Sequence, residues 1–155
     1  MRFQKACSSA LLIWLALATP AQPRILRSWS VDGLLKAATL AVVARPIGMK
    51  VITAKKILPD VTSGLVDDPN IYVDDVETTF EVLAVVKSTA YDGTFVLHHL
   101  RYTDNRGPAV VGPGLVDFEP GSGRRYLMFL DQEADGRYVA VSGLLESASA
   151  IIRID

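Results

Sequence analysis

The chain has 155 residues, with 16 basic and 17 acidic side chains, a formal net charge of −1 and a single cysteine. No run of basic residues exceeds two, which argues against nucleic-acid binding because that affinity comes from lysine and arginine contacts to phosphates. One cysteine cannot form a disulfide within the chain, nor the cysteine-rich sites that most often hold structural zinc.

The N-terminus has the layout of a secretory signal peptide. Arg2 and Lys5 form a positively charged start, residues 10–18 (ALLIWLALA) form an apolar core, and small residues follow. This order predicts cleavage after Ala18 or Ala21 and a mature protein that is secreted or periplasmic. An uncleaved membrane anchor is the alternative, but a membrane span needs about 20 apolar residues and this run is shorter.

Cleavage changes the composition of what remains. Cys7 leaves with residues 1–21, so the mature chain has no thiol, and its 14 basic and 17 acidic residues give a net charge of −3. Cys7 precedes the apolar run, whereas a lipoprotein cysteine follows it, so lipidation is not expected. Residues 22–155 have the length of one ordinary domain, and we expect a single one.

The first expected elements of the mature chain are a helix and a kinked strand. Ser30 has the side chain of an N-cap for a helix over residues 30–40. Residues 41–47 and 49–58 are then typical of one long strand with a kink, or of two strands. Pro46 cannot donate to a strand ladder, so it should mark a bend, a bulge or an edge.

Acidic and turn-forming residues then separate the first strands from the next. Residues 59–75 have loop composition, with Pro, Gly, Asn and five Asp. Residues 76–88 (VETTFEVLAVVKS) alternate strongly enough to predict a strand with Val76, Thr78, Phe80, Val82, Ala84 and Val86 on one face. Residues 91–93 supply a turn, and residues 94–103 predict another strand.

The last third of the chain predicts a hairpin after a glycine-rich connection. Residues 107–123 are rich in Gly and Pro, with a tight turn expected at Pro120-Gly121. Strands are expected at 125–130 and 137–142, joined by a turn at Asp135-Gly136. The tail from 144 to 154 is expected to dock as a short helix or a closing strand. Five or six strands with one or two short helices predict a mainly β, OB-like barrel, closed or partly open.

Three segments resemble the netrin-like domains of the tissue inhibitors of metalloproteinases. They are KAATLAVVAR (36–45), TTFEVLAVVKS (78–88) and GSGRRYLMFLDQEADGRYVAVSG (121–143). The resemblance, which also extends to bacterial secreted proteins of unassigned function, implies an OB-fold barrel. The animal inhibitors chelate the protease zinc through an N-terminal cysteine, and the mature chain has none. Their mechanism therefore does not carry over, and inhibition of a protease would need a different contact with its active site.

The two histidines give the first test for catalysis or metal binding. His98 and His99 are adjacent on an expected strand, so their side chains should point to opposite faces and cannot hold one metal together. We expect one to be exposed and the other half buried. The chain has no HExxH motif, and Val141-Ser142-Gly143 lacks the leading glycine of a GxSxG nucleophile elbow.

Two further segments invite a ligand-binding interpretation. Oxygen ligands of the kind that calcium prefers occur at Asp67, Asp68, Asn70, Asp74, Asp75 and Glu77, but without the spacing of an EF-hand. We expect a solvated acidic loop, with a weak calcium site as the alternative. Gly121-Ser122-Gly123 precedes a strand and not a helix, which favours barrel-rim turns over a phosphate loop.

The functional expectation is a secreted, non-enzymatic binding or interaction module with a protein partner. No catalytic, cofactor-binding or metal-ligating residue is assigned, and no cofactor is expected. The expected contact surface is the rim, with apolar residues Val110, Val111, Leu115 and Phe118. The alternatives are a protease inhibitor with a non-cysteine mechanism and an enzyme without a recognisable local motif. The partner's identity and the oligomeric state stay open.

Overall fold

A computed structural model of the protein describes residues 28–62, 70–88, 93–103 and 113–155, with the side chains of 59–62 left out. The expected signal peptide, residues 1–21, lies outside the described residues. The elements are α1 (Val31–Ala37), β1 (Leu40–Thr62), β2 (Asn70–Lys87), β3 (Thr94–Tyr102), β4 (Tyr126–Gln132), β5 (Tyr138–Ala140), the 3-10 helix η1 (Leu144–Ser149) and β6 (Ile151–Arg153).

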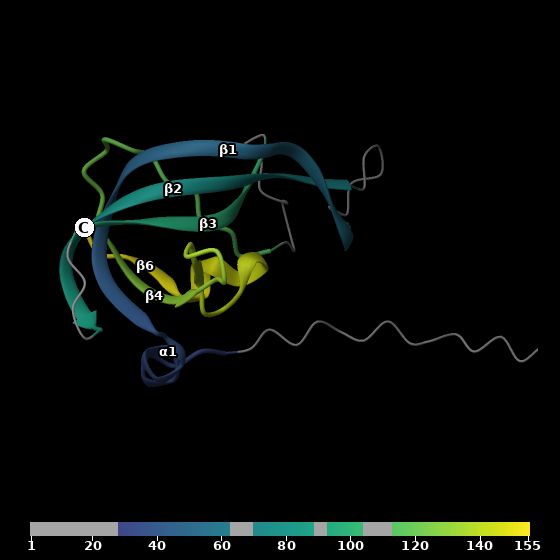
Figure 1. The fold of residues 1–155 in the computed structure, drawn as a ribbon. Coiled ribbons are helices and arrows are strands. Elements are labelled where there is room, and N and C mark those ends of the chain that lie inside the picture. The colour runs from purple at the N-terminus through teal and green to yellow at the C-terminus, as the bar shows by residue number, and fades with distance from the viewer. Residues whose placement is uncertain (1–27, 63–69, 89–92, 104–112) are drawn as a thin grey trace, which may run out of the picture.

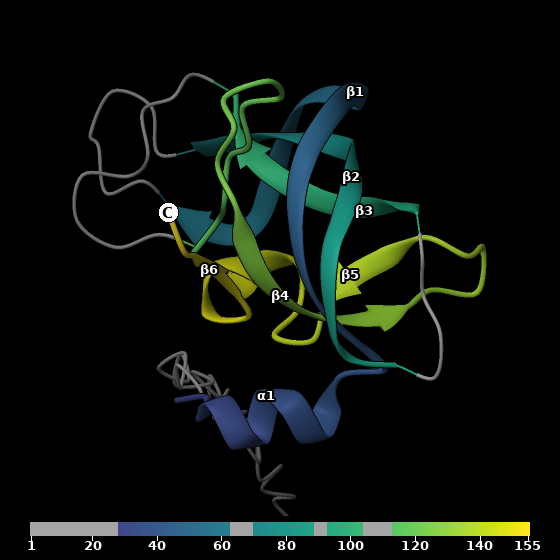
Figure 2. The same cartoon turned by 90° about the vertical axis from the view of Figure 1, so that its left-hand side faces the viewer.

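Five of the strands form a closed ring. The sheet order is β1-β2-β3-β5-β4-β6, and β1 also pairs with β4, which closes the barrel and leaves β6 on its outside (Figures 1 and 2). All neighbours are antiparallel except β3 and β5. This arrangement confirms the predicted mainly β, OB-like barrel with short helices.

β1 is a single long strand, and the kink expected at Pro46 is a register shift between Pro46 and Gly48. The loop predicted over residues 59–75 was wrong at both ends, because 59–62 belong to β1 and 70–75 belong to β2. Loop composition is overridden here because the β1–β2 ladder continues through this region. The tight turn at Pro120-Gly121 is confirmed, with the Ser122 amide donating to the Glu119 carbonyl.

Helix α1 begins as its sequence predicts and ends earlier. The Ser30 hydroxyl accepts a hydrogen bond from the Gly33 amide at 3.0 Å, as an N-cap does. The helix stops at Ala37. The Ala38 amide still donates to the Leu34 carbonyl, but the Thr39 amide donates instead to the Leu130 carbonyl on β4. Figures 1 and 2 show α1 at the end of the barrel where β1 begins.

The C-terminal end of α1 is held by a lysine at the end of strand β2. The Lys87 ammonium donates to the carbonyls of Leu35 at 2.8 Å, Lys36 at 3.3 Å and Ala38 at 2.6 Å. Carbonyls in the last turn of a helix have no partner within the helix, and a cation there also complements the helix dipole. The basic end of β2 therefore fixes α1 to the barrel.

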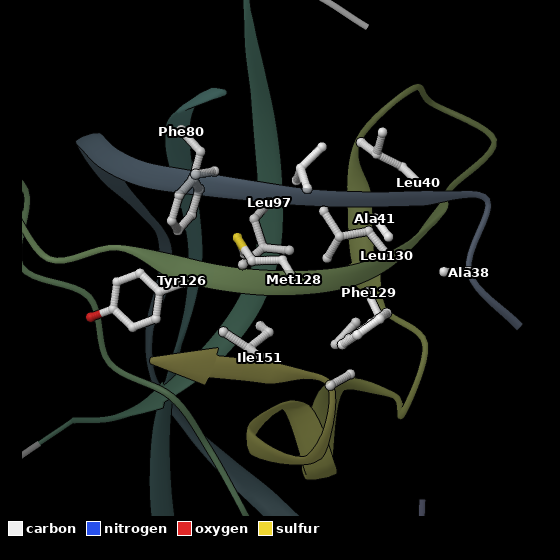
Figure 3. Close-up of a cluster of buried hydrophobic side chains, with 14 of the residues drawn as sticks. Ala38, Leu40, Ala41, Phe80, Leu97, Tyr126, Met128, Phe129, Leu130 and Ile151 are labelled. Atoms are coloured by element: carbon white, nitrogen blue, oxygen red, sulfur yellow. The ribbon is translucent and has the colours of Figure 1, made fainter. Parts of the chain in front are cut away.

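The barrel interior is filled by apolar and aromatic side chains from every strand of the ring (Figure 3). Phe80 stacks on Phe95 with ring centroids 5.4 Å apart, and Phe118 meets Phe80 edge-on at 4.9 Å. The face predicted for β2 is buried at Val76, Thr78 and Phe80 and half-buried at Val82. It is exposed at Ala84 and Val86, because the β2–β3 ladder ends at Glu81.

The predicted hairpin and tail both form. Gly136 has φ of 90° and donates to the Glu133 carbonyl, which makes the turn between β4 and β5. The tail supplies both of the elements that were weighed for it, η1 and then β6. Within the residues described, no helix is long and apolar enough to cross a membrane.

Candidate functional site

β3 places the two histidines on opposite faces, as expected. His99 points into the barrel, where its Nε2 lies 2.8 Å from the Thr78 hydroxyl and its ring meets Phe118 edge-on at 4.9 Å. Burial lowers the pKa of His99 to about 4, so the ring is neutral at physiological pH.

The outer histidine lies between two carboxylates. His98 Nε2 is 2.8 Å from Asp75 Oδ1, and His98 Nδ1 is 3.0 Å from Glu133 Oε2. Its side chain is only 12% exposed. The expectation of one exposed and one half-buried histidine was therefore wrong, because outer-face carboxylates shield His98 and the aromatic core encloses His99.

Neither histidine completes a nucleophile, base and acid array among the described residues. His99 contacts a hydroxyl, but its bonded partners include no carboxylate. His98 contacts two carboxylates, but its bonded partners include no hydroxyl. Each ring therefore has half of the contacts that general-base activation of a nucleophile uses.

The acidic residues singled out for calcium are separated by strand geometry. Asp67 and Asp68 lie outside the described residues, and Asn70 is exposed at the start of β2. Asp75 pairs with His98, and Glu77 with Arg137. In the described part of the chain no three His, Cys, Asp or Glu side chains converge on a point that could hold a metal ion.

Asp74 turns inward and fixes a bulge in β1. Its carboxylate accepts hydrogen bonds from the Lys55 amide, the Thr103 hydroxyl and the guanidinium of Arg101. Burial opposes ionisation, but these hydrogen bonds outweigh it and lower the pKa of Asp74. Lys55 has φ of 53°, a left-handed conformation unusual for a residue with a side chain. The carboxylate thus satisfies the amide that this bulge leaves without a ladder partner.

Of the four rim residues expected to make contacts, the structure describes Leu115 and Phe118. Phe118 is 3% exposed and packs in the aromatic core, so it is not a contact residue. Its prediction as a contact residue failed because a loop sequence does not show that the side chain turns inward, where its ring meets Phe80 and Tyr126. Val110 and Val111 lie outside the described residues. Leu115 lines a groove of about 250 Å³ together with Arg101, Tyr102, Val116 and Asp117.

The groove lies next to β1. Arg101 connects the two, because its guanidinium binds Asp74, lies 3.9 Å from Asp117 Oδ1 and contacts the sulfur of Met49 at 3.5 Å. The Tyr102 hydroxyl donates to the Pro113 carbonyl at 2.7 Å and holds the start of the groove-lining segment. The groove therefore combines an anchored cation with apolar walls.

The second half of β1 exposes several large apolar side chains, and sequence reasoning missed it. β4 pairs with β1 only over Leu40–Ala44, and beyond that β2 is the only described strand that pairs with it. Figure 1 shows β1 bending and continuing along β2, away from β4. The exposed apolar side chains there are Ile47, Met49, Val51, Ile52 and Ile57.

The signal for this edge was present in the sequence. Residues 49–58 (MKVITAKKIL) place apolar residues and three lysines side by side, which is unusual for a strand that is flanked on both sides. Neither a family model nor a curated protein matches this chain. The groove and the open edge of β1 are therefore the features from which a binding function is inferred.

Proposed function

We propose that this chain is a non-enzymatic binding module that takes an extended segment of a partner protein along the open edge of β1. The observation that supports this is the combination, on one strand, of exposed apolar side chains and an edge that no described strand pairs with beyond Ala44. A strand with a free edge offers N–H and C=O groups to an added strand, and alternate side chains of that strand set the specificity.

The charges on β1 favour an acidic partner. Lys50, Lys55 and Lys56 are exposed, and none of them forms an ion pair with a carboxylate of the described residues. Pairing of two copies edge to edge would bring lysines toward lysines, which opposes self-association through this edge. The partner chemistry that fits is an extended segment in which apolar and acidic residues alternate.

The neighbouring groove would accept one side chain of that segment. Its walls are apolar at Leu115 and Val116, and Arg101 lies at its border with Met49. An acidic or amide side chain entering there would meet the guanidinium, and its aliphatic part would contact Leu115. Electrostatic attraction of this kind favours the encounter and its specificity more than raw affinity.

We also propose that residues 1–21 direct export and that the protein acts outside the cytoplasm. The proposal rests on the charged, apolar and small-residue order of the N-terminus. Kinship with netrin-like domains is supported by the OB-like barrel and by the role of Lys87 at the end of the resembling segment. The absence of long basic runs and the acidic balance favour a protein partner over nucleic acid.

The test uses three synthetic peptides of alternating residues: valine with glutamate, valine with lysine, and glycine with serine. Each is titrated into ¹⁵N-labelled protein, and amide chemical shifts are followed. We expect the valine–glutamate peptide to shift amides of residues 46–57. Reversal of the three lysines (K50E, K55E and K56E together) should weaken it about tenfold.

A matched control and two contrary outcomes complete the test. Lys36→Glu reverses an exposed lysine on α1, and its binding should equal that of the unaltered protein. Shifts confined to other strands, or binding unchanged by the triple reversal, would refute the β1 edge as the site. Inhibition of a protease that survives the triple reversal would instead favour the inhibitor function.

A further inference from the structure

The β4–β5 hairpin closes the barrel through a very short ladder. β5 pairs with β3 at one position, Leu97 with Tyr138, and with β4 at three. Tyr138 also meets Phe95 edge-on at 5.6 Å inside this seam. With so few ladder contacts, the hairpin depends on side-chain contacts to stay against β3.

Those contacts are ionic and lie on the outer face. Glu133, at the start of the turn, contacts His98 on β3, and His98 in turn contacts Asp75 on β2. Arg137, after the turn, binds Glu77 at 3.1 Å and also contacts Glu133 at 3.4 Å. Two chains of ionic contacts thus join the hairpin to β2, and His98 is the middle of one of them.

The geometry at His98 is fully satisfied by only one protonation state. Both ring nitrogens lie within 3.0 Å of a carboxylate oxygen. An imidazolium donates from both nitrogens, whereas a neutral ring donates from one and turns a lone pair toward the other carboxylate. Loss of the proton therefore removes one charged hydrogen bond and adds a repulsion.

The charged groups around His98 are mostly acidic. Asp75 and Glu77 face it from β2, and Glu133, Asp135 and Arg137 surround it from the hairpin. Further along β3, Arg101 is engaged by Asp74, and His99 points into the barrel. Four carboxylates against one arginine make the immediate surroundings of His98 negative.

We infer that protonated His98 holds the β4–β5 hairpin against β2 and β3, and that loss of its proton loosens the hairpin. This movement would change the width of an open groove of about 340 Å³, which lies between residues 94–96 of β3 and residues 135–138 of the hairpin. Loosening would widen this groove when the ring loses its proton, and the groove would be narrower when both ring nitrogens are protonated. The inference does not depend on the β1 edge.

The experiment follows His98 and the hairpin separately by NMR on ¹⁵N-labelled protein. Ring nitrogen shifts report whether both nitrogens carry a proton. Hydrogen exchange of the Leu97 and Tyr138 amides, in the residue pair that joins β3 to β5, reports hairpin closure. Both are recorded at pH 5.5 and pH 8. The protection factor of these amides, which is corrected for intrinsic exchange, should be about fivefold lower where the ring carries one proton than where it carries two.

Variants separate this mechanism from a general effect of pH. His98→Gln and Glu133→Gln should both remove the pH dependence of the protection factor, and Glu133→Gln leaves β3 untouched should the first variant fold poorly. Asp131→Asn, which neutralises an exposed carboxylate nearby on β4, should behave as the unaltered protein. Constant protection, or the full pH dependence in either glutamine variant, would overturn the inference.

Discussion

The two halves of β1 have similar residues and opposite surroundings. Ala41, Val42 and Ala44 are buried because β2 flanks them on one side and β4 on the other. Met49 and Val51 are exposed because β4 has left the strand, and among the described strands only β2 remains beside them. Apolar composition alone therefore did not determine burial. The neighbouring strand did, because β4 pairs only with the first half of β1.

The largest expected effect on stability is the difference between two variants, each with an aspartate in one half of β1. Val42 is 0% exposed and Val51 is 41% exposed. Val42→Asp buries an unpaired carboxylate and should lower the free energy of unfolding by more than about 4 kcal/mol. Val51→Asp should cost less than about 1 kcal/mol, a difference of strand preference. Urea unfolding of both variants measures this, and equal losses would show that the two halves do not differ.

A smaller effect should come from acid, which acts on the barrel interior and not on the open edge. The pKa of His99 is about 4, below its ordinary value of 6.5. As pH falls from 6.5 to 4, the unfolded chain takes up a proton that the native protein does not. Stability is therefore full above 6.5 and should fall by up to about 3 kcal/mol on the way to pH 4.

The measurement is the free energy of urea unfolding at several pH values for the unaltered protein and for His99→Gln. The variant should lose most of the slope between pH 6.5 and 4, because it removes the titrating ring and keeps a polar group beside Thr78. His98→Gln is the matched control, since it alters the adjacent histidine on the other face. Equal slopes in the unaltered protein and His99→Gln would contradict the role given to burial.

The smallest expected effect on stability comes from Lys87, which lies beside the buried half of β1. Lys87 pairs with Ala41 in the ladder and caps α1 with its ammonium. Lys87→Met keeps most of the side-chain length but leaves helix carbonyls without this donor, and it should cost about 1 kcal/mol. Thermal unfolding measures the loss, and Lys50→Met in the exposed half should change stability by less than half as much. A larger loss for Lys50→Met would reverse the comparison.

Local chemistry allowed part of this structure to be predicted from the sequence. The cap at Ser30, the bulge at Pro46 and the turn at Gly136 follow from properties of single residues and their near neighbours. The strand count and the resulting barrel follow from alternation and from the need to cover edges.

What could not be predicted depends on residues far apart in sequence. His98 meets Glu133, 35 positions away, and Asp75, 23 positions away. Phe118 turns inward because Phe80 and Tyr126 make room for it, and a loop sequence does not carry that information. The lysines and apolar residues of 49–58 are a local signal of an open strand, but where the exposure of β1 begins follows from where β4 stops pairing.

The closure of the barrel also has a consequence for the rate of folding. Thr39 bonds Leu130, 91 positions away, and Lys87 bonds Leu35, 52 positions away. Contacts this distant require large loops to close before any of them stabilises the chain, and β-rich folds of this kind form in milliseconds to seconds. The first strand to be synthesised thus waits longest for its second neighbour. During that interval the edge that will pair with β4 is open, and a chaperone that recognises extended apolar segments would find its target in β1.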